Sequence, residues 1–102
     1  MRWRYLALRV EAEDMFTSKE LMDTIWGSVS KLYGEYGASR TGLALIDYDV
    51  EEKFVIIRAT HTSLENVRTA IASITKIGNK PAAIHLLAVS GTIKALLKKT
   101  RH

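Results

Sequence analysis

The stretch LALIDYDVEEKFVIIRATHTSLE, residues 43–65, decides the fold. Residues 43–47 and 54–60 are rich in aliphatic and β-branched side chains, and the acidic segment 48–52 lies between them. This pattern predicts two strands joined by a turn. Thr62-Ser63-Leu64-Glu65 then has the spacing of a capping box, in which the first and fourth residues bind each other's backbone N–H at the start of a helix. The centre of the chain is therefore expected to be strand–strand–helix.

A strand and a helix are also predicted before this stretch. Residues 3–12 place Leu6, Leu8 and Val10 on one side with period two, as a strand with one buried face does. The capping box at residues 17–20 (TSKE) predicts a helix from about residue 18 to residue 36, with Gly37 as its stop. Its expected apolar stripe consists of Leu21, Ile25, Val29, Leu32 and Tyr36, widened by Met22, Trp26 and Tyr33.

The rest of the chain is predicted to finish the second helix, form one more strand and end in a basic helix. Gly78-Asn79 is expected to close the second helix, and Pro81 to precede a strand over residues 83–88. The order β-α-β-β-α-β predicts a ferredoxin-like, RRM-like α+β sandwich, in which a four-stranded antiparallel sheet carries both long helices on one face. The 102 residues are expected to form a single domain, residues 1–102.

The composition is that of an ordinary soluble globular protein, with 47% hydrophobic and 25% charged residues. The absence of cysteine excludes disulfides, thiolate nucleophiles and cysteine-based zinc sites. The N-terminal residues mix Arg and Glu with apolar side chains, unlike a secretion signal. No apolar run approaches the ~20 residues of a membrane span. We therefore expect a cytoplasmic protein that does not interact with membranes.

The sheet face away from the long helices is expected to be too apolar to remain in water. Period-two counting assigns to it Tyr5, Ala7, Arg9, Phe54, Ile56, Arg58, His85 and Leu87. Either RNA bases stack on this face, as in RNA-recognition domains, or Ile93, Leu96 and Leu97 of the terminal helix cover it. The ribonucleoprotein signature is absent from residues 53–60 (KFVIIRAT), which favours the covered face.

The net charge of +4 is concentrated at the C-terminal end. Residues 89–102 contain no acid and four cations, which are Lys94, Lys98, Lys99 and Arg101, so the rest of the chain balances at 11 against 11. Ser90 or Thr92 can cap a helix whose free N–H groups suit a phosphate. An RNA-binding tail is one interpretation, and a charged helix end whose cations interact favourably with the helix dipole is the other.

No catalytic constellation is evident elsewhere. The histidines at positions 61, 85 and 102 are scattered, and His85 is interpreted as a half-buried packing residue. The acids of the turn, residues 47–52, lack the spacing of a calcium loop. There is no glycine-rich phosphate loop, and no serine has an evident base. The sequence predicts neither catalytic residues nor metal ligands.

Three segments resemble the archaeal ribonuclease P protein component 2 family. VSGTIKALLKK (residues 89–99) is similar to its C-terminal signature, in which a strand ends in V-S-G-T-I-R/K and runs into a basic helix. RYLALRV (residues 4–10) resembles its opening strand, and LMDTIWGSVSKLYGEYGAS (residues 21–39) its I-W-x-x-x-x-x-x-x-G-E-x-G pattern. The fold of this family is the ferredoxin-like α/β sandwich.

The resemblance implies a subunit of the ribonucleoprotein that removes the 5′ leader from precursor tRNA. In that enzyme the RNA, with bound magnesium, performs the cleavage, and the protein itself holds no cofactor. The implied partners are ribonuclease P RNA, precursor tRNA, ribonuclease P protein component 3, and a second copy of component 2 as a homodimer within a heterotetramer. The runner-up is a ferredoxin-like regulatory or protein-interaction module that does not bind RNA.

The resemblance also suggests which residues contact RNA. Ser90, Gly91, Thr92 and Lys94 match the signature itself. Lys98, Lys99 and Arg101 match as basic positions of the tail, and Arg9 and Arg58 are additional candidates for RNA or partner contact.

Overall fold

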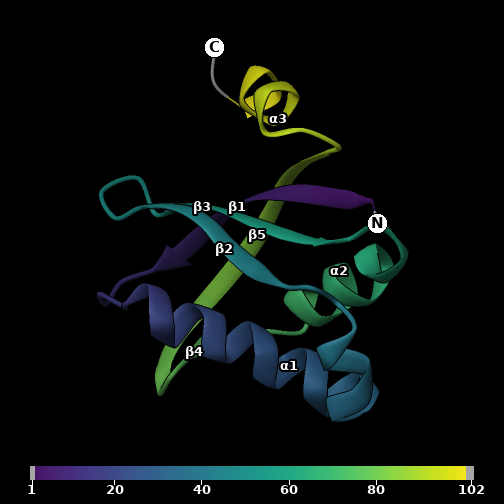
Figure 1. Cartoon of the computed structure of the whole chain (residues 1–102). Coiled ribbons are helices and arrows are strands. Elements are labelled where there is room, and N and C mark those ends of the chain that lie inside the picture. The colour runs from purple at the N-terminus through teal and green to yellow at the C-terminus, as the bar shows by residue number, and fades with distance from the viewer. Residues whose placement is uncertain (1, 101–102) are drawn as a thin grey trace.

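The computed structural model describes residues 2–100, and its elements follow the predicted order with one additional strand (Figure 1). The elements are β1 (Trp3–Ala12), α1 (Ser18–Ser39), β2 (Ala44–Asp49), β3 (Phe54–Thr60), the 3₁₀ turn η1 (His61–Ser63), α2 (Leu64–Ala72), β4 (Lys76–Ile77), β5 (Lys80–Ser90) and α3 (Ile93–Thr100). The antiparallel sheet has the order β2-β3-β1-β5-β4. The ferredoxin-like plan is confirmed, with α1 and α2 on one face of the sheet and α3 on the other.

The prediction of four strands was wrong by one, because Gly78-Asn79 does not end α2. That helix ends at Ala72, and Gly78-Asn79 is the two-residue turn of a hairpin between β4 and β5. Gly78 has a positive φ of 63°, which glycine adopts without strain and which tight hairpin turns need. The short strand β4 pairs with Lys80 and Pro81 at the start of β5.

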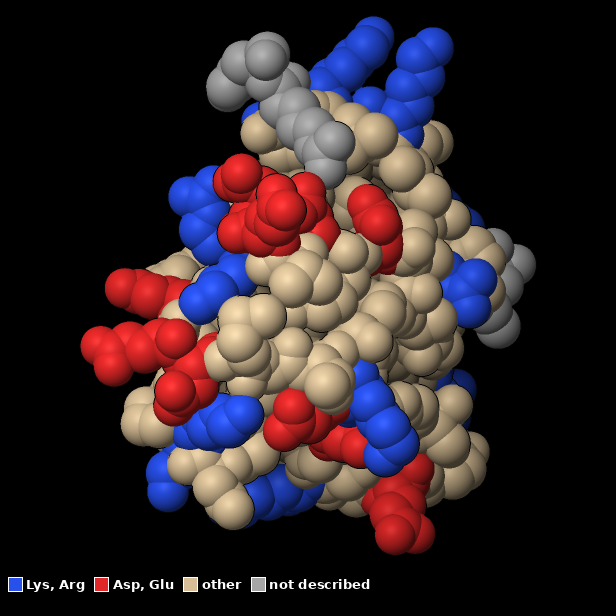
Figure 2. Space-filling model, turned by 90° about the vertical axis from the view of Figure 1, so that its left-hand side faces the viewer, with Lys and Arg blue, Asp and Glu red and all other residues tan. Residues whose placement is uncertain are grey.

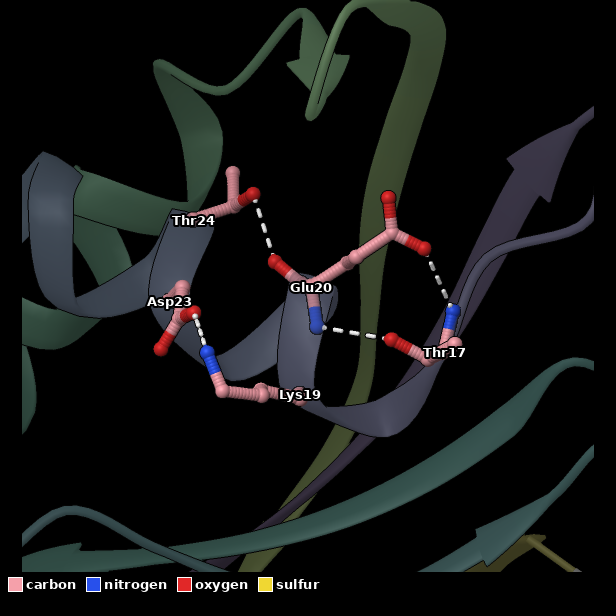
Figure 3. A network of polar contacts seen from close by, with 5 residues as sticks. All are labelled: Thr17, Lys19, Glu20, Asp23 and Thr24. Carbon is pink, nitrogen blue, oxygen red and sulfur yellow. Dashed lines mark hydrogen bonds and ion pairs between the residues drawn. The ribbon is translucent and has the colours of Figure 1, made fainter.

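The first predicted capping box is confirmed, and Figure 3 shows it. The Thr17 hydroxyl accepts a hydrogen bond from the Glu20 N–H at 3.1 Å, and the Glu20 carboxylate accepts one from the Thr17 N–H at 3.0 Å. Lys19, within the box, forms an exposed ion pair at 3.0 Å with Asp23, one turn further along the helix. The start of α1 is therefore fixed by its own side chains.

The second predicted capping box is wrong. Residues 61–63 form the turn η1, and Ser63, with φ −100° and ψ 2°, makes no side-chain cap to α2. The Ser63 hydroxyl instead accepts a hydrogen bond from the Thr60 hydroxyl at 2.9 Å. The helix is thus entered through a 3₁₀ turn, and Thr62 is left exposed.

The predicted stop of α1 at Gly37 is also wrong, since the helix continues to Ser39. Its geometry is broken earlier, at Gly34, where φ is 78° and ψ is 167°. The break changes the rotational phase of the last turn, so Ala38 enters the core and Tyr36 is 74% exposed. Leu32, which was expected in the buried stripe, is 47% exposed.

The main core lies between the sheet and the helices α1 and α2. Leu6, Leu8 and Val10 of β1 are buried there, as the period-two pattern predicted. They pack with buried side chains of both helices and β3, including Leu21, Ile25, Val29, Val55, Ile57, Val67 and Ile71. Beside this core, Tyr48 stacks on Phe16 with ring centroids 5.6 Å apart, and burial raises the pKa of Tyr48. None of the described helices is both long enough and apolar enough to span a membrane.

A second, smaller core lies on the opposite face of the sheet. Leu96 of α3 is fully buried against Ala7, Phe54 and Ile56, with Leu97 partly buried beside it. The prediction that the terminal helix covers this face is confirmed for these two leucines. It is wrong for Ile93, which is 37% exposed at the first position of α3.

Candidate nucleic-acid interface

The turn between β5 and α3 is built by Ser90, Gly91 and Thr92. Thr92 is the cap of α3, because its hydroxyl accepts a hydrogen bond from the Ala95 N–H at 3.2 Å. Ser90 is the last residue of β5, opposite Tyr5 of β1, and its hydroxyl lies 3.5 Å from the Thr92 nitrogen. Of the two residues that could cap α3, Thr92 is the one that does so. The pairing of Ser90 with Tyr5 places this turn beside the start of β1.

The predicted cations of α3 have different surroundings. Lys94 and Lys98 are exposed, and neither ammonium group has a hydrogen bond or ion pair within the part of the chain that the structure describes. Lys99 is also exposed, but its ammonium donates to the Val89 carbonyl at 2.9 Å and so ties α3 to β5. Arg101 lies outside the described residues. Two free ammonium groups therefore point away from a helix that Leu96 anchors.

The structure places the two additional candidates, Arg9 and Arg58, at opposite ends of the second face. Arg9 lies opposite Phe54 and lines a hollow together with two acids, Asp49 and Glu52. Arg58 lies opposite Tyr5, and its guanidinium carbon is 4.1 Å from the centroid of the Trp3 ring. Arg58 is therefore the better placed of the two for a negatively charged ligand.

Charges of opposite sign separate along the sheet. The end at which β1 finishes and β2 turns into β3 is called here the acidic end, and it contains Glu11, Glu13, Asp14, Asp49, Glu51 and Glu52. Figure 2 looks onto this end and shows the acidic side chains gathered there, with basic ones between them. Some of the cations here are occupied locally, since Lys53 and Lys80 donate to the carbonyls of Ala12 and Met15.

The opposite end of the sheet is basic. We call basic end the set formed by Arg2, Arg4, Arg40, Arg58 and His61, which come from the start of β1, the loop after α1, β3 and η1. His61 N–H donates to the Arg2 carbonyl at 2.9 Å, which joins two of these segments. Sequence reasoning found Arg58 and missed the other four. Arg2, Arg4 and His61 could have been found from the antiparallel pairing expected for β1 and β3, which brings the start of β1 beside the end of β3.

The histidines and acids do not assemble a metal site in residues 2–100. His85, which was interpreted as half-buried, is exposed, and its Nε2 lies 2.8 Å from a carboxylate oxygen of Glu11. His61 belongs to the basic end, and His102 lies outside the described residues. The chemistry that this arrangement offers is the binding of anions, through ammonium and guanidinium groups.

Comparison with known proteins shows similarity to one protein family along nearly the whole chain. The sequence profile of the Rpp14/Pop5 family matches residues 4–101. The chain is 35% identical to ribonuclease P protein component 2 of Pyrococcus abyssi over 94% of this chain and 81% of that protein. It is 33% identical to the protein of that name from Methanosarcina barkeri, covering 94% of this chain and 70% of the relative, and 32% identical to that of Pyrococcus furiosus, covering 94% and 80%.

The fold has a counterpart among solved structures. A chain in the cryo-EM structure of yeast ribonuclease MRP superposes with a TM-score of 0.75, over 97% of this chain and 88% of that one, at 15% identity. This likeness shows a shared fold. The profile match, together with relatives that align over most of both chains, establishes that the chain belongs to the Rpp14/Pop5 family.

Proposed function

We propose that this protein is the component 2 subunit of ribonuclease P, which binds the catalytic RNA and supports it in removing the 5′ leader from precursor tRNA. The observation that carries this proposal is the tail. Residues 90–94, which match the family signature, form a capped turn into a helix that Leu96 fixes to the sheet. The helix presents Lys94 and Lys98 outward without ion-pair partners among the described residues. Exposed ammonium groups on a fixed helix suit the phosphates of RNA.

In this proposal the RNA and its bound magnesium perform the cleavage, and the protein binds and positions the RNA. The groups brought together at the tail and the basic end are cations and hydroxyls. Such groups stabilise a folded polyanion by neutralising phosphates and releasing condensed counterions.

The protein partners proposed are component 3 and a second copy of this chain. Support comes from the exposed apolar side chains on the last turns of α1, where Leu32, Tyr33 and Tyr36 are 47%, 37% and 74% exposed. Aromatic residues of this kind are enriched in protein interfaces. We expect component 3 to co-purify with this chain, and separate migration of the two proteins on a sizing column at micromolar concentration would count against the pairing.

The function is tested by reconstitution. Precursor tRNA cleavage is measured with the catalytic RNA, magnesium and component 3, with and without this chain. We expect the complete mixture to cleave faster, and this chain alone to leave precursor tRNA intact. If the chain neither stimulates cleavage nor binds the RNA in a salt-dependent way, the subunit role is contradicted. The alternative, a protein-interaction module that does not bind RNA, is then favoured.

A further inference from the structure

We infer that the basic end is a second phosphate-binding site, which holds the same RNA strand that the tail contacts. This inference rests on the proposed function and deepens it. It adds Arg2, Arg4, Arg40 and His61 to the RNA-contacting surface, beside Arg58, which the sequence had already suggested, and none of these residues is on α3.

The basic end contains a hollow lined by basic side chains, which could receive a phosphate group. Its volume is ≈ 460 Å³, and the residues around it are Arg2, Trp3, Ser39, Arg40, Gly42, Thr60, His61 and Thr62. Two guanidinium groups and an imidazole therefore share one concave surface with the exposed hydroxyl of Thr62, which can donate to a phosphate oxygen. The planar guanidinium fork matches two oxygens of one phosphate, which favours phosphate over a simple anion.

The charges of the basic end are not neutralised within the protein. None of its arginines forms an ion pair in the described part of the chain, where the ion pairs are Lys19–Asp23, Glu65–Arg68 and Glu11–His85. The guanidinium of Arg40 interacts with a neutral side chain, that of Tyr36, with Nη1 3.3 Å from the Tyr36 hydroxyl and Cζ 5.5 Å from the ring centroid. The guanidinium of Arg58 lies over the Trp3 ring, 4.1 Å from its centroid, and adds positive charge beside the hollow, although its buried Nε cannot itself reach a ligand. These groups retain donors and positive charge for an external anion.

The basic end is continuous with the tail. A Cβ placed on Gly91 would lie 3.4 Å from Nη1 of Arg4, so the turn before α3 contacts an arginine of the basic end. Tyr5 lies opposite Ser90, and Arg2 precedes Tyr5 by three residues of extended chain, about 10 Å at strand spacing. The hollow and the tail are therefore close enough for one backbone segment to cross Arg4 and meet both. This continuity favours RNA over an acidic protein as the occupant.

The test removes charge at either end of the sheet. The variant Arg2→Gln/Arg40→Gln neutralises two exposed side chains of the hollow, and Lys19→Gln/Lys76→Gln neutralises two exposed lysines away from it. Binding of in-vitro-transcribed ribonuclease P RNA is measured over a range of salt concentrations. We expect the first variant to lower the log–log salt slope by roughly 1.4–1.8, from 0.7–0.9 per lost contact, and the control to leave it unchanged.

A second readout uses the two tryptophans, Trp3 in the hollow and Trp26 on α1. In a Trp26→Phe protein, Trp3 emission should change when RNA is added, and in a Trp3→Phe protein the Trp26 emission should not. An unchanged slope for the Arg2/Arg40 variant, or a silent Trp3, overturns the inference. If Lys94→Ala/Lys98→Ala still lowers the slope in that case, the proposed function stands. Absence of salt-dependent binding by the unmodified protein would overturn both.

Discussion

Gly42 lies against the indole ring of Trp3 so closely that a Cβ at this position would be 2.6 Å from Cζ3 of the ring. Gly42 also has a φ of 60°, which side-chain-bearing residues rarely adopt. The guanidinium of Arg58 covers the same ring, with 4.1 Å between its carbon and the ring centroid. Trp3 is thus held by the loop after α1 and by β3, and this contact shapes the wall of the hollow at the basic end.

Gly42→Ala should therefore destabilise the fold. The left-handed conformation costs roughly 1–2 kcal/mol for a residue with a Cβ, and displacement of Trp3 adds to it. Gly27→Ala is the matched control, because Gly27 lies inside α1 with open space around its Cβ position. There alanine should stabilise by about 0.5–1 kcal/mol. Urea denaturation measures both, and equal shifts of the two variants would contradict the contact.

Leu96→Ala should lower the free energy of unfolding by roughly 2–5 kcal/mol, because Leu96 is fully buried in the second core. Ile93→Ala, one turn earlier on the same helix, should cost much less, since Ile93 is 37% exposed. Thermal unfolding distinguishes them: each kcal/mol corresponds to about 4–8 °C in a domain of this size. Similar melting temperatures for the two variants would mean that α3 is not anchored to the sheet by Leu96.

The two predicted capping boxes differ in the structure, and a pair of variants tests the difference. Thr17→Ala removes a cap that is present and should cost about 0.5–2 kcal/mol of stability. Thr62→Ala removes an exposed side chain that caps nothing, so its effect should stay within about 0.5 kcal/mol. Chemical denaturation of both proteins is sufficient. A large loss for Thr62→Ala would show that the second helix begins at the predicted box after all.

The lysines of α3 should separate into two classes. Lys94→Ala/Lys98→Ala removes two free ammonium groups and should lower the salt slope of RNA binding by roughly 1.4–1.8, with the fold intact. Lys99→Met removes the hydrogen bond to the Val89 carbonyl and should cost at most roughly 1 kcal/mol of stability. Binding at several salt concentrations, with a parallel denaturation curve, measures both effects. An unchanged slope in the folded double variant would mean that RNA contacts the protein elsewhere.

Much of the fold could be predicted because its signals are local in sequence. The burial of Leu6, Leu8 and Val10 follows from the two-residue period of an extended chain. The capping box of Thr17 and Glu20 closes within one helical turn, so no distant segment is needed to form it. The basic helix with an apolar side was likewise evident from residues 93–99, and that apolar side required a surface to cover.

Other features depend on contacts between distant segments. Thr62 and Glu65 had the spacing of a capping box, but residues 61–63 form a 3₁₀ turn in which the Ser63 hydroxyl accepts a hydrogen bond from Thr60 at the end of β3. Gly78-Asn79 was equally suited to end a helix or to turn a hairpin, and pairing of β4 with the start of β5 selected the hairpin. The break of α1 at Gly34 was not predicted, because the apolar spacing continues beyond this residue and side-chain periodicity does not report backbone φ.

The sequence by itself determined the order of the main elements, apart from the short strand β4 and the turn η1, as well as the covered second face and the charge of the tail. It could not determine the basic end, because residues 1–88 are neutral in sum, with 11 cations and 11 acids. Only the tertiary structure separates these charges. Antiparallel pairing of β1 with β3 and β5 brings residues 2–4, 40, 58–61 and 91 together at one end of the sheet, and it leaves the β2–β3 turn at the other. Electrostatic attraction depends on distance in space, and the order of residues along the chain does not give that distance.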